Sequence, residues 1–138
     1  MQKLPVIIQG GMGAGVSNWR LAQAVSRLGQ LGVVSGTALD QIFARRLQDG
    51  DLDGHMRRGV DAFPFPAMAE RVWQRYYIAG GKGERIPYRP VPRHEKDNPR
   101  ELIELDMVSN FVEVFLARQG HAHPVRSEEH TSELQSPA

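Results

Sequence analysis

Along the first fifty residues, short apolar runs alternate with segments whose apolar residues recur at helical spacing. The run Val6 to Ile8 is β-branched and apolar at every position, and Leu31 to Val34 repeats this pattern. A run without polar alternation is typical of a strand covered on both faces, as in a parallel sheet. Apolar residues at helical spacing follow each run: Leu21, Val25 and Leu28 after the first, and Leu39, Ile42, Phe43 and Leu47 after the second. We therefore predict the order β-α-β-α over residues 5–50, with parallel strands and right-handed crossovers.

Capping residues frame both predicted helices. Ser17 is a good N-cap for the first helix, and Gly29 closes it. Thr37 followed by Asp40 resembles a capping box, and Gly50 ends the second helix. The residues between each predicted strand and its helix are therefore loops.

Residues 53–120 have a helical pattern. Asp53 to Phe63 predicts a short helix, and Pro66 opens another with an apolar side formed by Met68, Val72, Trp73 and Tyr76. Gly80 to Pro99 holds three glycines and four prolines and predicts an irregular connection. Asn98 to Glu101 places an N-cap, a first-turn proline and a reciprocal carboxylate in order, which predicts a helix that continues to the end of this region.

Composition excludes several classes of protein. The chain has 138 residues, whereas a complete eight-stranded α/β barrel needs roughly 250. Hydrophobic residues make up 41%, which is enough for a core, and the absence of cysteine excludes disulfides and thiolate metal sites. The chain has 17 basic and 16 acidic residues, so its net charge is too small to attract nucleic acid or anionic lipid electrostatically. No apolar stretch is long enough for a membrane span, so we expect a cytoplasmic protein.

The residues from Arg126 onward differ from the rest of the chain. They read RSEEHTSELQSPA, with one aliphatic residue and no turn or strand pattern. A frayed polar terminus would have such a composition. The string also looks like the in-frame translation of a widely used short-read sequencing adapter, from Arg126 to Pro137. We therefore expect residues 1–125 to be a natural N-terminal fragment and residues 126–138 to be an adapter-derived disordered tail.

The glycine-rich loop after the first predicted strand, Gly10 to Gly15, invites a nucleotide-binding interpretation. A dinucleotide fingerprint needs glycine at relative positions one, three and six, but Val16 or Asn18 occupies the third of these positions. The second predicted strand also ends in Ser35-Gly36 instead of an acidic residue able to hold a ribose. The glycines and the hydroxyl of Gly10 to Ser17 match a P-loop motif, but Val16 occupies the position of its phosphate-binding lysine.

Two interpretations of this loop remain. A tight strand-to-helix turn also uses glycine, because glycine adopts conformations closed to other residues. Such a turn would rarely need four glycines in the six residues from Gly10 to Gly15. We favour a loop that approaches a planar ligand closely.

An EF-like acidic segment and the histidines do not form metal-binding motifs. Asp49 to Gly54 matches the first half of a calcium-binding EF loop, but its twelfth position is Val60 instead of a bidentate glutamate. We interpret these acidic residues as caps of the next helix. The histidines, which are His55, His94, His121, His123 and His130, lack metal-ligand spacing and are interpreted as surface residues.

The proline-rich segment Pro87 to Arg93 could pass for a PxxP ligand, and we interpret it as a rigid internal connector. The chain has no serine in a nucleophile elbow and no acid pair of the glycosidase type.

The stretch Pro5 to Asp40, PVIIQGGMGAGVSNWRLAQAVSRLGQLGVVSGTALD, resembles the opening of the nitronate monooxygenase family, formerly called 2-nitropropane dioxygenases. Leu39 to His55 and Asn110 to His121 (NFVEVFLARQGH) resemble one branch of that family. Flavin-dependent enoyl reductases of fatty-acid synthesis share a related opening. The resemblance covers residues 1–125 and is more specific for the superfamily than for the reaction.

The resemblance implies an α/β fold: the first two βα units of an FMN-type (β/α)8 barrel, with a helical insertion over residues 53–120. It implies FMN at the carboxyl ends of the strands. The residues that would line the isoalloxazine are Gly10, Gly11, Met12 and Gly13 after the first strand and Ser35, Gly36 and Thr37 after the second. Backbone N–H groups there would stabilise the electron-rich reduced flavin.

In that family an alkyl nitronate reduces FMN, dioxygen is consumed, and a carbonyl compound and nitrite leave. The segments that would hold the FMN phosphate and supply a base lie later in such barrels, so no catalytic residue is named and the chain alone is expected to bind little FMN. The second interpretation is a flavin-dependent enoyl reductase. The third, of another class, is a non-catalytic helical interaction module built around Pro66 to Gly120.

Overall fold

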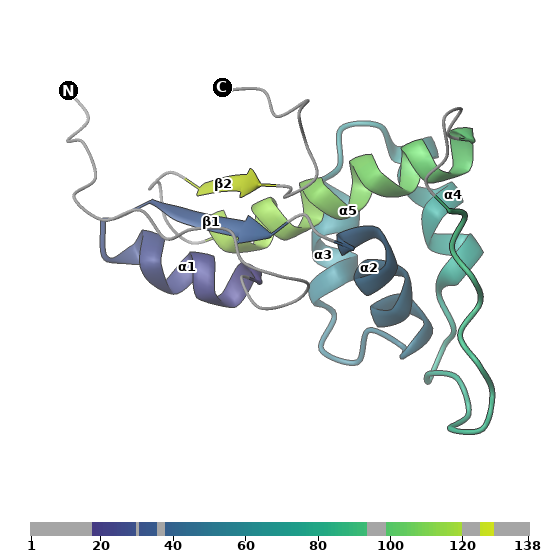
Figure 1. Ribbon diagram of the computed structural model, residues 1–138. Helices are drawn as coiled ribbons and strands as arrows, with labels where there is room; N and C mark the ends of the chain where they lie inside the picture. The colour runs from purple at the N-terminus through teal and green to yellow at the C-terminus, as the bar shows by residue number, and fades with distance from the viewer. Residues whose placement is uncertain (1–17, 30, 36–37, 94–98, 120–124, 129–138) are drawn as a thin grey trace. The chain divides into compact units, whose positions relative to one another are not determined.

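A computed structural model of the chain describes residues 18–29, 31–35, 38–93, 99–119 and 125–128. Their order is α1 (Trp19–Arg27), β1 (Gly32–Ser35), α2 (Leu39–Gln48), α3 (His55–Ala62), α4 (Pro66–Tyr76), α5 (Arg100–Arg118) and β2 (Val125–Glu128) (Figure 1). The chain divides into two compact units. The strand unit comprises Met1–Ala38 and Glu113–Ala138, and the helical unit comprises Leu39–Val112.

The strand unit is built on a parallel pair of short strands. β1 pairs with β2 so that Gly32 lies opposite Val125 and Ser35 opposite Glu128. Helix α1 packs against β1 and runs in the opposite direction, so its N-terminus lies toward the carboxyl end of β1 (Figure 1). The approach is close, because a Cβ atom added to Gly32 would lie 2.1 Å from the carbonyl oxygen of Ala22. A glycine at this position therefore lets the helix rest directly on the strand backbone.

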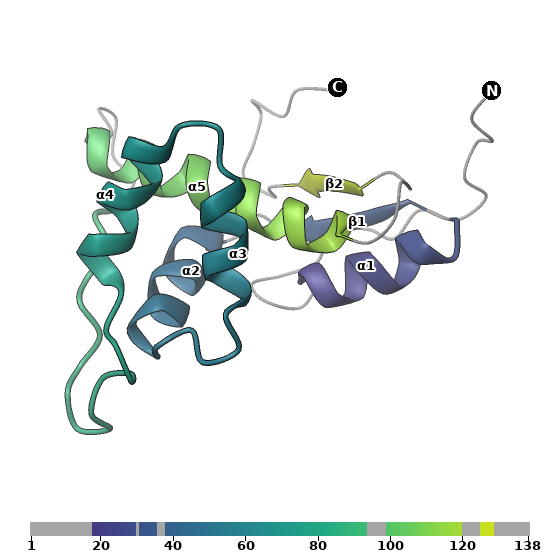
Figure 2. The ribbon, with the colours of Figure 1, turned by 180° about the vertical axis from the view of Figure 1, so that it is seen from behind.

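The helical unit has its own apolar core. Helices α2, α3 and α4 lie side by side (Figure 2). Helix α3 also approaches α5 closely at Gly59, where an added Cβ would lie 2.5 Å from Cγ1 of Val112. The buried side chains recur at helical spacing along each helix: Phe43, Leu47, Met56, Val60, Ala69, Val72, Tyr76, Leu102, Leu105, Val108 and Val112. Helical periodicity in the sequence thus becomes the buried stripe of each helix.

The structure contradicts the predicted fold class. The described residues are mostly helical, with five helices, and they do not form the first two βα units of an FMN-type (β/α)8 barrel. In the described part of the chain the two strands pair only with each other. The physical reason is that α2 is followed by three further helices, so β1 receives no partner from the sequence directly after it. The predicted strand at residues 6–8 lies outside the described residues.

Most of the predicted elements are present. The run predicted at residues 31–34 is β1, and the helices predicted after Asp53, Pro66 and Asn98 are α3, α4 and α5. One cap differs: Asn18 is the N-cap of α1, and its side chain accepts a hydrogen bond from the backbone N–H of Leu21. Ser17, the predicted cap, lies outside the described residues, as does Thr37 of the predicted capping box.

Residues 126–128 belong to β2, although the segment from Arg126 onward has no strand pattern. A parallel ladder is formed by backbone N–H and C=O groups, which every residue except proline carries. The open edge of β1 can therefore take a partner whose side chains carry no strand signal. The remaining predicted tail residues, 129–138, lie outside the described part.

Within the described residues, no helix combines the length and the apolar character that crossing a membrane requires.

Candidate functional site

The predicted flavin-contacting residues fall largely outside the described part of the chain. Gly10, Gly11, Met12 and Gly13 precede it, and Gly36 and Thr37 fall in a short gap within it. Ser35 is described as the last residue of β1. The predicted site can therefore be judged only from the neighbouring elements, which are α1 and β1.

These flanking elements meet at one edge of the strand unit. Because α1 runs opposite to β1, Asn18 at its N-terminus and Ser35 at the end of β1 lie toward the same side (Figure 1). In the sequence, the glycine-rich residues 10–15 come shortly before Asn18, and Gly36 and Thr37 follow Ser35. In α/β proteins, ligands commonly bind outside the carboxyl ends of parallel strands.

The N-terminus of α1 is occupied by a buried carboxylate. Oε1 of Glu113, on α5, accepts a hydrogen bond of 2.8 Å from the backbone N–H of Trp19, the first residue of α1. The residue is 1% exposed. Helix N-termini carry unpaired N–H groups and a partial positive charge, so a carboxylate there is favourable.

A reciprocal contact ties α1 to the C-terminus of α5. Nε2 of Gln23 donates to the backbone carbonyl oxygens of Leu116 at 3.1 Å and Gln119 at 3.2 Å. Leu116 lies in the last turn of α5 and Gln119 directly follows the helix, where carbonyl groups lack intrahelical partners. Each helix thus supplies a side chain that satisfies backbone groups at an end of the other.

The sequence interpretation missed Glu113. Its signal is an acidic residue within the apolar run Phe111 to Leu116. A carboxylate inside such a run is costly to bury unless it meets a hydrogen-bond donor. The partner lies 94 residues away, so the sequence alone does not identify it.

A second polar cluster lies in the helical unit, between α4 and α5. Its side chains line an open depression of about 290 Å³ and are Arg71, Arg75, Arg100, Glu101 and Glu104. The Arg71 guanidinium donates hydrogen bonds to both carboxylate oxygens of Glu104, from Nε to Oε1 at 3.2 Å and from Nη2 to Oε2 at 2.5 Å. Nε of Arg100 lies 3.6 Å from Oε2 of Glu104. Hydrogen bonding from Arg71 lowers the pKa of Glu104 below its ordinary value. Nε of Arg75 lies 3.4 Å from Oε1 of Glu101.

This cluster joins two helices. Both of its carboxylates already face guanidinium groups, and every described pair in it runs within or between α4 and α5. Nη1 of Arg75 is buried without a hydrogen-bond partner among the described residues and is closed to solvent. An enclosed donor cannot receive a ligand from the depression, so we interpret the cluster as an ion-pair connection between the helices.

Tyr76 extends this connection into the core of the helical unit. Its side chain is 1% exposed, and its hydroxyl donates to Oε1 of Glu101 at 3.3 Å. Burial, followed by the charge of Glu101, raises the pKa of Tyr76 to about 12 from its ordinary 10.0. Both causes favour the neutral phenol.

The raised pKa predicts alkaline destabilisation. A proton held more tightly by the folded state contributes stability that is fully present below pH 10 and is lost as pH rises toward 12. We expect Tyr76 to account for a loss of about 2–3 kcal/mol in the free energy of unfolding over this interval. Urea unfolding at a series of pH values measures it. In Tyr76→Phe, which has no proton to lose, this part of the loss should disappear; an equal alkaline loss in both proteins would contradict the assignment.

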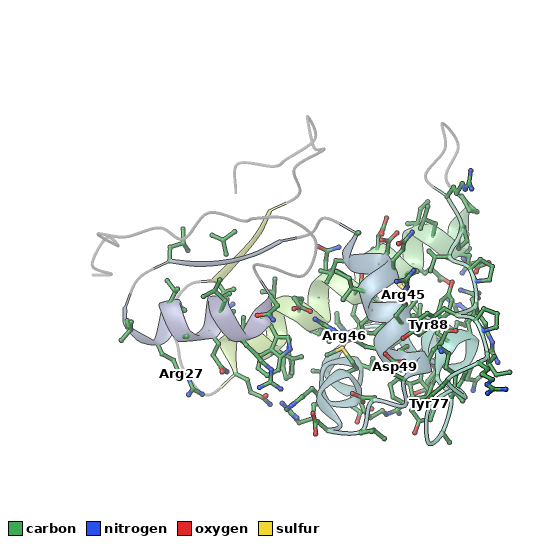
Figure 3. The ribbon with its side chains drawn as sticks, turned by 60° about the horizontal axis from the view of Figure 1, so that its bottom comes forward. Arg27, Arg45, Arg46, Asp49, Tyr77 and Tyr88 are labelled. Atoms are coloured by element: carbon green, nitrogen blue, oxygen red, sulfur yellow. The ribbon has the colours of Figure 1, made fainter. Side chains whose placement is uncertain are left out.

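Tyr88 anchors the proline-rich segment to the end of α2. Its hydroxyl donates to Oδ1 of Asp49 at 2.7 Å, and the Arg45 guanidinium lies 5.0 Å from its ring centroid (Figure 3). The Lys82 ammonium lies 4.4 Å from the same centroid. The hydrogen bond to Asp49 raises the pKa of Tyr88. The backbone N–H of Arg89 also donates to the buried side chain of Gln48 at 2.6 Å, which agrees with the interpretation of an internal connector.

The EF-like segment serves as a helix cap. Oδ1 and Oδ2 of Asp51 accept hydrogen bonds from the backbone N–H groups of Met56 and Arg57 in the first turn of α3, at 3.0 and 2.9 Å. The capping interpretation is therefore confirmed for Asp51. Among the described residues, no three His, Cys, Asp or Glu side chains are placed to hold a metal ion. His55 contacts the Arg58 guanidinium at 2.8 Å, and the other histidines lie outside the described part.

Comparison of the chain with models of known protein families, with curated proteins and with solved structures finds no match.

Proposed function

We propose that this chain contributes the ring-contacting part of an FMN site in an enzyme that oxidises alkyl nitronates with dioxygen, in the cytoplasm. The observation that carries the proposal is the resemblance of Pro5 to Asp40 to nitronate monooxygenases. The geometry of the strand unit supports it, because the elements that flank both predicted ligand-contacting loops lie at one edge.

The surroundings fit the two parts of FMN differently. A flat ring is the part of FMN that we expect at the edge between Asn18 and Ser35, since four of the six residues from Gly10 to Gly15 are glycine and carry no side chain that would hold a ring away. The N-terminus of α1 does not suit the FMN phosphate, because Glu113 already places a carboxylate there. FMN would supply the electron acceptor, and the chain's own loops would hold the ring and limit the access of water.

The test begins with the DNA. Re-reading the source DNA beyond the codon for Val125 is expected to show a reading frame that departs from RSEEHTSELQSPA. The protein encoded by that DNA is then titrated with FMN, followed by quenching of flavin fluorescence, and assayed for nitrite release from an alkyl nitronate. We expect stoichiometric FMN binding and nitrite release.

Two glycine variants make the test specific. Gly11→Val should lower FMN affinity by roughly tenfold or more, because a branched side chain would keep the ring away from the loop backbone. Gly83→Ala is the matched control: its added Cβ would meet only the Ile86 side chain, at 3.4 Å. Reduction of bound flavin by NAD(P)H without nitronate oxidation would favour the enoyl reductase. Absence of FMN binding by the full encoded protein would contradict both flavin enzymes.

A non-catalytic helical interaction module is the second candidate. It is favoured by one observation: most of the predicted stretch Pro66 to Gly120, as far as Val112, lies in the compact unit Leu39–Val112, which has its own buried core. This candidate requires the helical unit to fold by itself. Cooperative thermal unfolding of a 39–112 fragment, together with failure of the encoded protein to bind FMN, would favour it over the enzyme.

A further inference from the structure

Two loops of opposite charge lie side by side in the helical unit. The acidic loop, residues 49–54, joins α2 to α3 and carries three aspartates and no basic residue. The basic loop, residues 82–93, follows α4 and carries four basic residues and one glutamate. The backbones come close where the loops begin, because a Cβ added to Gly50 would lie 2.7 Å from the backbone nitrogen of Gly81. Both loops lie at the same end of this unit (Figures 1 and 2).

Hydrogen bonds hold both loops in place. The Tyr88 hydroxyl donates to Oδ1 of Asp49 at 2.7 Å, and Figure 3 labels both side chains. The backbone N–H of Lys82 donates to the carbonyl oxygen of Gln48 at 2.8 Å. The carboxylate of Asp51 caps α3. A surface that is ordered before binding loses little conformational entropy when a partner docks on it.

Each loop presents a large apolar side chain next to a charged one. Leu52 of the acidic loop is 82% exposed and precedes Asp53. Ile86 of the basic loop is 58% exposed and follows Arg85, in a turn that its backbone N–H closes by donating to the carbonyl oxygen of Gly83 at 3.0 Å. Within the described residues, the exposed side chains of Asp53 and Arg85 form no hydrogen bond or ion pair. Apolar side chains at the centre and charged ones at the rim are typical of a protein–protein interface.

We propose that the acidic and basic loops form a docking surface for a second copy of this chain. In a two-fold pair both copies use the same surface, so every contact occurs twice. Because the loops adjoin and differ in the sign of their charge, a two-fold axis between them places each acidic loop opposite the basic loop of the other copy. Asp53 of one copy then approaches Arg85 of the other.

The surface favours a second copy over an unrelated partner because its charges are complementary to themselves. A surface of one sign would call for a partner of the other sign, whereas this surface carries both signs on adjoining loops. Association would also remove the exposed side chains of Leu52 and Ile86 from water. The proposal does not depend on FMN binding, because all of these residues lie in the helical unit.

The experiment measures the oligomeric state of the full chain by sedimentation equilibrium. At low ionic strength, wild type is expected to form dimers with a dissociation constant of about 10–100 µM, and added salt should weaken them by screening the charges. Leu52→Asn and Ile86→Asn should each weaken association by roughly tenfold or more. Ile103→Asn is the matched control, because it changes an exposed apolar residue on α5 and should leave association unchanged.

Charge reversal makes the test specific to the pairing of these loops. Asp53→Arg places basic side chains in both loops, and Arg85→Asp places acidic ones in both, so each variant alone should be monomeric. Mixed in equal amounts, the two variants should associate about as tightly as wild type, since each acidic side chain again faces a basic one. Both positions are exposed, so the fold should be unaffected, and circular dichroism checks this.

Several outcomes would overturn the proposal. Wild type that stays monomeric up to roughly 1 mM would show that the surface has another partner or none. Dimers that persist unchanged in Leu52→Asn, or that are lost in Ile103→Asn, would show that the copies meet through another surface. Charge variants that do not associate on mixing would show that the loops do not face each other. The FMN titration is a separate measurement, so failure of the proposed function leaves these results unaffected.

Discussion

Gly32→Ala is expected to destabilise the strand unit strongly. The added Cβ would lie 2.1 Å from the carbonyl oxygen of Ala22, 2.8 Å from its carbonyl carbon and 3.0 Å from its Cα. All three atoms belong to the backbone of α1, so no side-chain rotation relieves the overlap, and the helix must move off the strand. Overpacking usually costs about 1–3 kcal/mol, and a clash with backbone lies at the upper end or beyond. We expect a loss of about 3 kcal/mol or more.

Tryptophan fluorescence measures this effect within the strand unit. The chain has two tryptophans, Trp19 on α1 and Trp73 on α4. In a Trp73→Phe background, urea unfolding followed by the emission of Trp19 should shift to a much lower midpoint in Gly32→Ala.

Gly29→Ala is the matched control for Gly32→Ala. Gly29 has a φ of +81°, and an added Cβ would meet nothing within 4 Å. Its cost should be only the strain of a left-handed alanine, about 1 kcal/mol. Equal midpoints for the two variants would contradict close packing of α1 on β1.

Leu105→Ala is expected to destabilise the helical unit by about 2–5 kcal/mol. Leu105 lies on α5 and is fully buried, so truncation removes apolar contacts and leaves a cavity that its neighbours fill only in part. Urea unfolding in a Trp19→Phe background, followed by Trp73 emission, measures the loss. The slope of the free energy against urea should stay the same, because the surface exposed on unfolding hardly changes.

Ile103→Ala is the control for Leu105→Ala on the same helix. Ile103 is 48% exposed, so its truncation removes little buried area and should cost less than about 1 kcal/mol. The difference between two residues of similar size separates burial from helix propensity, since alanine is the better helix former at either position. A loss for Ile103→Ala as large as that for Leu105→Ala would contradict the assignment of the buried face.

In the strand unit, some of the residues that hold α1 in place are close in the chain to those predicted to contact the ligand. Gly32, Gln23 and Glu113 hold α1 against its neighbours, and the predicted ligand-contacting loops adjoin the same elements. Variants at these positions therefore need a folding control before any change in FMN affinity is interpreted. The exposed glycine Gly83 and the exposed acid Glu84 supply such controls.

The helices could be predicted because their signals are local. Apolar spacing in α2 and α4, Pro66 at the first position of α4 and Gly50 after α2 act within one or two turns of the helix they define. The capping role of Asp51 before α3 could be predicted for the same reason. Parallel strand pairing was predicted from element order, but the partner of β1 in the structure is β2, far along the chain.

The sequence by itself determined which segments of this protein are helical, where those helices end, and that a glycine-rich segment precedes α1. Only the tertiary structure decided that the described residues form two units without the predicted barrel, that β1 pairs with residues 125–128, and that Glu113 fills the N-terminus of α1. The physical reason is range. Propensity, periodicity and capping act between neighbours, whereas strand pairing and the burial of a carboxylate depend on a partner that folding brings in from some 94 residues away.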